Sequence, residues 1–177
     1  MSDLLKYPIG LFEKPMVITP EHLQQYITDL SSFPKRLRLA VEALPESMMD
    51  TPYRPSGWTV RQVVHHCADS HMNNFIRIKL ALTEENPTIK PYYEDRWAEL
   101  PDSLTMPVEP SLVMLEGIHQ RWVMLLHSMR PSDFQKGFFH PEKNRLVTLD
   151  ENTGIYAWHS NHHLAHVQSI LKIRSGS

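Results

Sequence analysis

The sequence has little cysteine and little glycine. Cys67 is the only cysteine among 177 residues, which excludes an internal disulfide and every zinc site built from several cysteines. A metal ion bound by this chain would therefore be held by nitrogen or oxygen atoms. The six glycines form no phosphate-binding loop, and neither a serine nucleophile elbow nor a paired-carboxylate motif is present.

An excess of positive charge and long apolar runs are also lacking. The 18 basic and 20 acidic side chains give a formal net charge of -2, so no broad positive field favours nucleic acid or an anionic membrane surface. No segment is apolar enough to span a membrane, and charges and prolines interrupt the start, where a secretory signal needs an unbroken apolar stretch. We expect a cytoplasmic protein with a single domain over residues 1–177.

Apolar residues recur at helical spacing in four segments, which cover residues 20–44, 59–86, 110–129 and about 151–173. Thr19 has the position of a cap on the first helix, and Pro34 is expected to kink or restart that helix. Thr59 and Gln62 have the spacing of a capping box at the start of the second helix. These signals predict four long amphipathic helices.

The connections between these helices contain most of the prolines. Residues 87–110 hold five of them around a short aromatic patch, which is typical of a long crossover connection. No convincing pair of adjacent strands is present, since the only β-like runs, at 63–65 and 145–149, are short. The pattern predicts an all-α fold, a four-helix bundle with a long proline-rich crossover connection.

The outlying feature of the composition is histidine. Three of the 11 histidines fall between residues 65 and 71, and four fall between residues 159 and 166. Histidines four residues apart share a helix face and can chelate one metal ion, as His159 with His163 or His162 with His166 could. At about 100° per residue, each histidine has a direction around the helix that can be compared with the centre of the apolar face. His163 deviates from that centre by about 35° and His159 by about 75°. The deviations of His166 and His162 are larger, about 95° and 130°. The pair His159 and His163 is expected to face inward.

On the second helix His65, His66 and His71 compete, and the apolar pattern does not separate His65 from His66. Two histidines need at least one further ligand for a tight site. A third neutral imidazole would leave a coordination position free for water or substrate. We therefore expect one divalent transition metal held by histidines from both helices.

Several blocks of sequence carry a family resemblance, namely KYPIG, DTPYRPSGWTVRQVVHHCADSHMN, IRIKLALTEENP, GFFHPEKN and YAWHSNHHLAHV. They resemble the DinB superfamily and, within it, the YfiT proteins of bacilli, which are described as metal-dependent hydrolases. The resemblance spans nearly the whole chain. It implies a four-helix bundle that holds a nickel or zinc ion by three histidines, at positions that match His66, His159 and His163.

The resemblance implies that the protein is a metal-dependent hydrolase. In such an enzyme the three-histidine site activates a bound water molecule, which attacks a small-molecule substrate. An alternative is a metal-dependent S-transferase that activates a low-molecular-weight thiol such as bacillithiol, or mycothiol in relatives, for transfer to an electrophile. A third is a non-catalytic metal-binding helical module. Related proteins form dimers, so a homodimer is a further expectation.

The other polar residues near the clusters have more ordinary explanations. Lone helical histidines usually lie at the surface or half-buried, which is expected of His22, His119, His127 and His140. Four further histidines are expected either to support the ligands from behind or to lie at the surface; they are His65, His71, His162 and His166. Asp69 is a candidate for a supporting role, with a solvated carboxylate as the equal alternative. Cys67 is expected in the core and Trp58 as a packing anchor.

Overall fold

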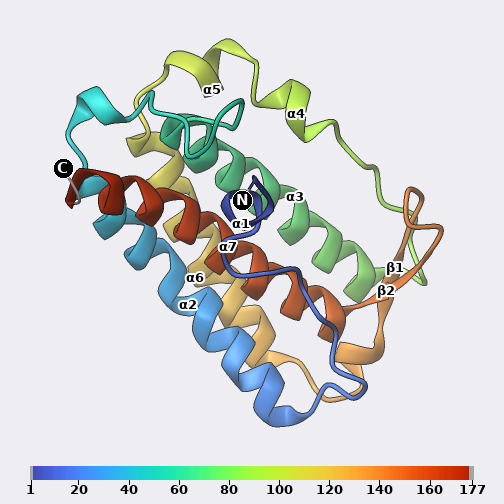
Figure 1. Cartoon of the computed structure of the whole chain (residues 1–177). Coiled ribbons are helices and arrows are strands. Elements are labelled where there is room, and N and C mark those ends of the chain that lie inside the picture. The colour runs from blue at the N-terminus through green and yellow to red at the C-terminus, as the bar shows by residue number, and fades with distance from the viewer. Residues whose placement is uncertain (1, 176–177) are drawn as a thin grey trace.

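Four long helices make up most of the chain. The computed structural model describes residues 2–175, with side chains for residues 4–171, so the ends of the expected domain 1–177 lie outside the described residues. The long helices are α2 (Pro20–Glu42), α3 (Val60–Thr83), α6 (Glu109–Ser128) and α7 (Leu149–Ser175). Both α2 and α3 pack against α6 and against α7 (Figure 1). The predicted four-helix bundle is confirmed. In the described part of the chain, no helix is long and apolar enough to cross a membrane.

The helices α2 and α3 begin at the predicted threonine caps. The Thr19 hydroxyl accepts a hydrogen bond from the backbone N–H of His22, and the His22 ring accepts one from the N–H of Thr19. Thr59 and Gln62 exchange the same pair of bonds at the start of α3. Each box satisfies backbone amides that have no partner within the helix. The first turn of α3 is thereby fixed just ahead of its histidines.

The helix α2 runs without a break through Pro34, so the expectation that the proline restarts the helix is wrong. Proline has no N–H to donate to the carbonyl of Leu30, four residues earlier. That carbonyl oxygen instead lies 2.7 Å from Nδ1 of His119 on α6. A side chain from another helix thus replaces the bond that the proline removes.

The connections contain shorter helices, namely α1 (Ser2–Lys6), η1 (Glu46–Met48), α4 (Glu94–Trp97), α5 (Pro101–Thr105) and η2 (Asp133–Gln135). The proline-rich connection carries α4 and α5 and runs back alongside α3, so that α3 and α6 point in the same direction (Figure 1). This confirms the predicted long crossover connection. The crossover places α4 and α5 against the outer side of α3.

A short antiparallel hairpin precedes α7, with strands β1 (Gly137–His140) and β2 (Arg145–Thr148). The expectation of no adjacent strands is therefore wrong here, although the other β-like run, at 63–65, is helical as part of α3. The hairpin turn closes with a bond from the N–H of Asn144 to the carbonyl of Pro141, at 3.1 Å. Asn144 has a positive φ of 47°, a conformation that asparagine adopts more readily than most residues.

Two clusters of buried apolar side chains fill the bundle. One includes Leu37, Val64, Leu115 and Val167, and the other includes Leu30, Ile78, Trp122 and Ala157. Each long helix contributes to both clusters. On α3, α6 and α7 the residues between these contributions include His71, His119, His159 and His163. A polar layer of histidines therefore separates two apolar clusters.

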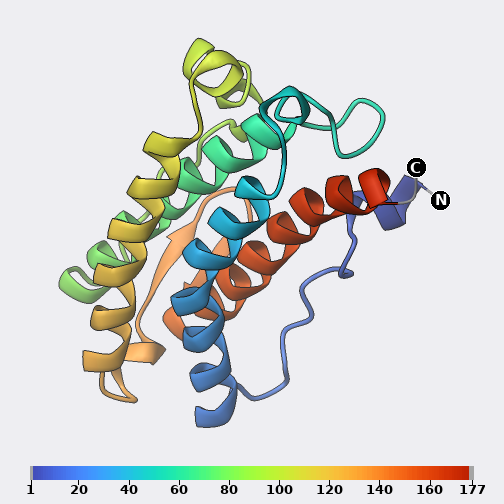
Figure 2. The same cartoon turned by 90° about the vertical axis from the view of Figure 1, so that its left-hand side faces the viewer.

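The N-terminal segment, residues 7–19, runs along α7 toward the start of α2 (Figures 1 and 2). The indole N–H of Trp158 donates to the carbonyl of Gly10 at 3.1 Å. Nε2 of His166 lies 3.1 Å from the carbonyl oxygen of Lys6, at the end of α1. This segment covers a face of α7 that would otherwise be open to solvent.

Candidate metal centre

The structure brings together the three histidines for which a metal-binding role is predicted. His66 is buried on α3, and His159 and His163 lie one turn apart on α7. Nε2 of His66 is 3.2 Å from Nε2 of His159. One ring nitrogen from each of the three residues lies within 4.8 Å of the others, which is close enough for a single ion to contact all three.

The two neighbouring histidines of α3 point to different surroundings. Nδ1 of His65 bonds to the hydroxyl of Ser111 at 2.7 Å, and its Nε2 bonds to the carbonyl of Met106 at 3.1 Å. His65 therefore holds the start of α6 and the end of the crossover. His66 turns toward α7, a distinction that the apolar pattern of the sequence did not make.

Burial keeps the three clustered imidazoles neutral. It lowers the pKa of His66 to about 4. Burial, followed by the neighbouring histidines, lowers the pKa values of His159 and His163 well below the usual value. Neutral imidazole is the form that binds metals. A set of three imidazole nitrogen donors, two buried and one half-buried, suits ions such as Zn²⁺ and Ni²⁺ better than Mg²⁺ or Ca²⁺, so the residues present fit a transition metal.

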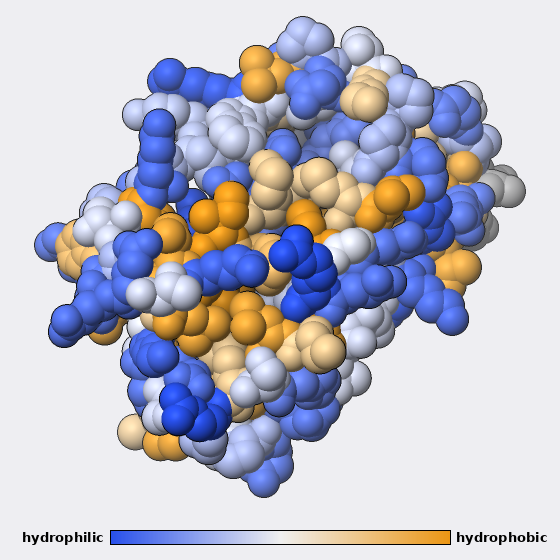
Figure 3. Space-filling view, turned by 180° about the vertical axis from the view of Figure 1, so that it is seen from behind, coloured by the Kyte–Doolittle hydropathy of each residue, from blue (hydrophilic) through white to orange (hydrophobic). Residues whose placement is uncertain are grey.

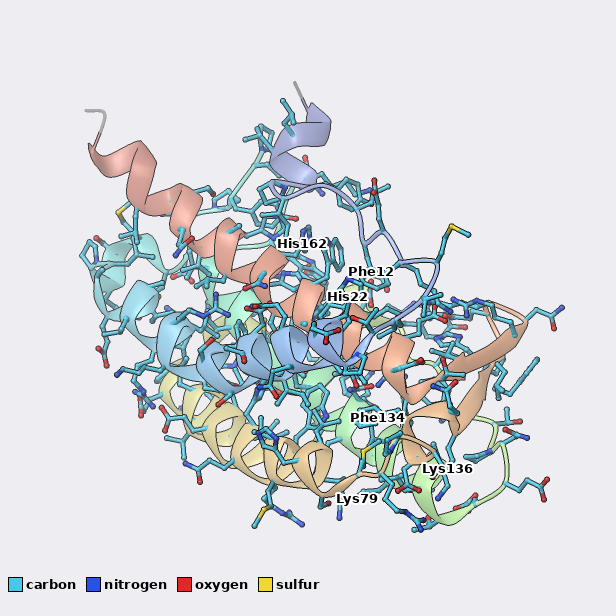
Figure 4. The ribbon with its side chains drawn as sticks, turned by 90° about the horizontal axis from the view of Figure 1, so that it is seen from below. Phe12, His22, Lys79, Phe134, Lys136 and His162 are labelled. Atoms are coloured by element: carbon cyan, nitrogen blue, oxygen red, sulfur yellow. The ribbon has the colours of Figure 1, made fainter. Side chains whose placement is uncertain are left out.

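Of the two positions expected for His162 and His166, behind the ligands or at the surface, the surface position is wrong. Both are buried, because the N-terminal segment and the loop before α3 cover them. The His162 ring is 5.8 Å from that of Tyr7, and His166 stacks on Tyr53 at 3.7 Å. Figure 4 shows His162 between α7 and the N-terminal segment. With His163 these two residues form a second group of close nitrogen atoms.

The prediction for the lone histidines is confirmed at three positions and wrong at one. His22 and His140 are half-buried and His127 is exposed. His119, however, is only 2 % exposed, and its Nε2 lies 2.7 Å from Nδ1 of His71. The sequence carried one usable signal for it, since the unpartnered carbonyl that Pro34 leaves requires a donor from another element.

Cys67, Asp69 and Trp58 differ in their surroundings. Cys67 is fully buried in the core, as predicted, and burial raises the pKa of its thiol. Burial, and then Asp102, raises the pKa of the Asp69 carboxyl to about 6; among the interactions of the described residues, none joins this carboxylate to the clustered histidines. The Trp58 ring lies 4.6 Å from that of His66, so Trp58 packs against the site itself.

Two cavities open beside the histidines. The larger, of about 480 Å³, is lined by all three clustered histidines together with Trp58 and Tyr53. The smaller, of about 250 Å³, borders His159, and its lining includes the aromatic and charged side chains of Tyr92, Tyr156, Arg77, Lys143, Glu94 and Glu142. Volumes of this order accommodate small molecules, and both cavities reach His159.

A four-helix bundle with a cluster of three histidines beside a cavity defines a helical protein with a candidate metal site. The DinB superfamily matches residues 29–167, and the chain belongs to that superfamily.

Its relatives match along almost their entire length. A protein of Bacillus mycoides (strain KBAB4) is 53% identical over 170 residues, which cover 96% of each chain. One from Bacillus cereus (strain 03BB102) is 54% identical over 172 residues, which cover 97% of this chain and 98% of the relative. Both carry the name "Putative metal-dependent hydrolase".

Two solved structures share the fold. YfiT from Bacillus subtilis, described as "a probable metal-dependent hydrolase with an unusual four-helix bundle topology", is 46% identical; it matches with a TM-score of 0.94 over 97% of this chain and 98% of its own. A mycothiol-dependent maleylpyruvate isomerase matches with a TM-score of 0.65 at 14% identity, over 82% of this chain and 60% of its own. The second likeness concerns the fold alone.

Proposed function

We propose that this protein is a metal-dependent hydrolase that binds one zinc or nickel ion through His66, His159 and His163. The observation that carries the proposal is the clustering of three neutral imidazoles, two buried and one half-buried, on the wall of a cavity. The names of the relatives support the same reading. When bound, such an ion supplies Lewis acidity that brings the pKa of a water molecule beside it toward neutrality.

The protein's own residues supply orientation and shelter. His159 and His163 approach from consecutive turns of one rigid helix, and His66 approaches from a facing helix, so the donor set is fixed before any ligand arrives. Trp58 covers one side of His66 and narrows the access of bulk water. The smaller cavity, with charges of both signs, would hold a polar part of the substrate next to His159.

A metal-dependent S-transferase is the second candidate function. The larger cavity reaches all three histidines and has a volume of about 480 Å³, which is sufficient for a low-molecular-weight thiol such as bacillithiol. An ion that activates water also activates a thiol. The two functions therefore share a site and differ in the nucleophile.

The first experiment measures metal content. The purified protein is analysed for bound metals, and the variants H66A, H159A and H163A are compared with H127A, in which an exposed histidine of α6 is removed. We expect about one ion per chain in the parent protein and in H127A, and a loss of tight binding in the other three. Unchanged metal content in H66A, H159A and H163A would contradict the proposed site.

The second experiment separates the reactions. The metal-loaded protein is incubated with a panel of esters, amides and electrophiles, with and without bacillithiol. Turnover without thiol supports hydrolysis, and turnover only with thiol supports transfer. Stoichiometric metal with no turnover of any kind would favour the non-catalytic metal-binding module instead.

Several expectations from the sequence remain predictions. They include a cytoplasmic location, the absence of nucleic-acid binding, a single functional domain and a homodimer. Figure 3 shows apolar side chains gathered on the face opposite that of Figure 1, and exposed apolar residues of α3 and α6 include Ile76, Val113 and Met124. Light scattering would measure the oligomeric state directly.

A further inference from the structure

Behind each of the two clustered histidines of α7 stands a chain of hydrogen bonds made by other histidines. Nδ1 of His159 lies 3.1 Å from Nε2 of His71, and Nδ1 of His71 lies 2.7 Å from Nε2 of His119. Nδ1 of His119 is 2.7 Å from the carbonyl oxygen of Leu30. His71 and His119 are almost fully buried. This series of hydrogen bonds thus ends inside the protein, at the backbone carbonyl of Leu30.

The carbonyl oxygen of Leu30 determines which nitrogen donates and which accepts in each of these hydrogen bonds. A carbonyl oxygen can only accept, so Nδ1 of His119 carries the hydrogen. A buried imidazole without an acidic partner is neutral and has one N–H, so Nε2 of His119 must accept from Nδ1 of His71. By the same reasoning, Nε2 of His71 accepts from Nδ1 of His159. The lone pair of His159 is left on Nε2, the atom that lies 3.2 Å from Nε2 of His66.

A shorter chain stands behind the other histidine. Nε2 of His166 lies 3.1 Å from the carbonyl oxygen of Lys6 and must donate to it. Nδ1 of His166 then accepts, and Nδ1 of His163 faces it at 3.4 Å. The lone pair of His163 is again left on Nε2. Two separate series of hydrogen bonds therefore lead to the same tautomer.

We propose that His71, His119 and His166 are positioning residues that hold His159 and His163 in the Nδ1–H tautomer, with both Nε2 lone pairs presented to the metal. Histidine side chains that are free in water favour the opposite tautomer, in which Nε2 carries the hydrogen. Backbone carbonyls and carboxylates commonly orient metal-bound histidines; here an imidazole transmits the preference of a distant carbonyl. The tautomer assignment concerns the metal-free protein, and only its effect on metal affinity rests on the proposed function.

The direct test is nitrogen NMR of the metal-free protein. Two-bond ¹H–¹⁵N spectra of protein labelled at histidine distinguish Nδ1–H from Nε2–H rings, and single-histidine variants assign them. We expect the Nδ1–H form for His71, His119, His159 and His163, and the Nε2–H form for His166. An Nε2–H or mixed population at His159 or His163 would overturn the proposal; the tautomers are read from spectra of the parent protein, and the variants serve only to assign its signals.

Paired substitutions test the effect on the metal. In H71Q the amide oxygen can still accept from His159, whereas H71L cannot; in H166N the amide oxygen can still accept from His163, whereas H166L cannot. We expect H71L and H166L to weaken zinc binding by about 10- to 100-fold, and H71Q, H166N and the exposed control H127L to stay within a few-fold of the parent.

The result to measure is the zinc dissociation constant, by competition with a chelating indicator. Equal losses in the leucine and amide variants, or no loss in either, would contradict a positioning role. Failure of the parent protein to bind zinc or nickel would instead contradict the proposed function, while the NMR spectra would still decide the tautomers.

Discussion

Gly154 of α7 lies directly against the ring of Tyr26 in α2. A Cβ atom at this glycine would stand 2.8 Å from Cε2 of Tyr26 and 3.1 Å from the ring of Phe12 in the N-terminal segment. The absence of a side chain therefore allows α2, α7 and the N-terminal segment to meet. Gly154 precedes His159, the first clustered histidine of α7, by about one and a half helical turns.

This contact reverses the usual effect of replacing a helical glycine by alanine. Such a change normally stabilises a helix by about 0.5–1 kcal/mol. At Gly154 we expect G154A to lower the free energy of unfolding by about 1–3 kcal/mol, because the rings must move. Gly117 of α6 is the matched control, since a Cβ there meets no atom within 4 Å. Urea unfolding should show opposite signs for G154A and G117A; a stabilised G154A would contradict the contact.

The bond between His119 and the carbonyl of Leu30 predicts a coupling with Pro34. In the parent protein, H119F leaves that buried carbonyl unpartnered, at a cost of about 1–3 kcal/mol. In the P34A background the N–H of the new alanine can bond to the same oxygen, so H119F should cost less. The contact with His71 is lost in both backgrounds and cancels. Urea unfolding of the four metal-free proteins measures the difference, and equal costs of H119F in the two backgrounds would refute the coupling.

Glu151 predicts a loss of stability in acid. Its carboxylate is buried and accepts bonds from Arg145 and Lys14, at 2.5 and 2.8 Å. Burial alone would raise the pKa of Glu151, but these two bonds outweigh it and leave the pKa below the usual value of 4.5. The carboxylate therefore contributes stability that is fully present above about pH 4.5 and is lost as the pH falls through the lower folded-state pKa.

The variant E151Q tests this directly. At pH 7 we expect its free energy of unfolding to fall by about 1–3 kcal/mol, because the bonds to charged donors become bonds to a neutral acceptor. Between pH 5 and pH 2 its stability should decline less steeply than that of the parent. The exposed Glu84 provides the control variant E84Q, which should follow the parent. If the free energies of unfolding of E151Q and of the parent fell equally steeply between pH 5 and pH 2, Glu151 would not be the cause of the loss of stability in acid.

Local signals in the sequence predicted the helices well. The capping residues Thr19 and Thr59 act through neighbours three positions away, and apolar periodicity depends only on the helix that carries it. The hairpin before α7 was missed because its strands are four residues each, too short for alternation to stand out. Its turn depends on the positive φ of Asn144, a conformation that no apolar pattern reports.

The histidine layer was predicted less completely. Helical phase identified His159 and His163 as inward-facing, but it did not decide whether His162 and His166 lie behind them or at the surface. His162 and His166 are buried because the N-terminal segment, distant in sequence, lies over that side. His119 was missed for a similar reason, since its partner is a carbonyl that only the bundle brings near. Contacts between segments that are distant in sequence do not change the apolar periodicity of either segment, so this pattern cannot reveal them.

The separation of the clustered histidines along the chain has a consequence for when the proposed metal site can form. His66 stands 93 residues before His159, and α7 follows the other three long helices in the order of synthesis. A growing chain therefore exposes His66 long before the helix that carries the other two donors exists. Under the proposed function, the complete set of three donors exists only after α7 has docked against α2 and α3, so tight metal binding would follow the folding of the last helix.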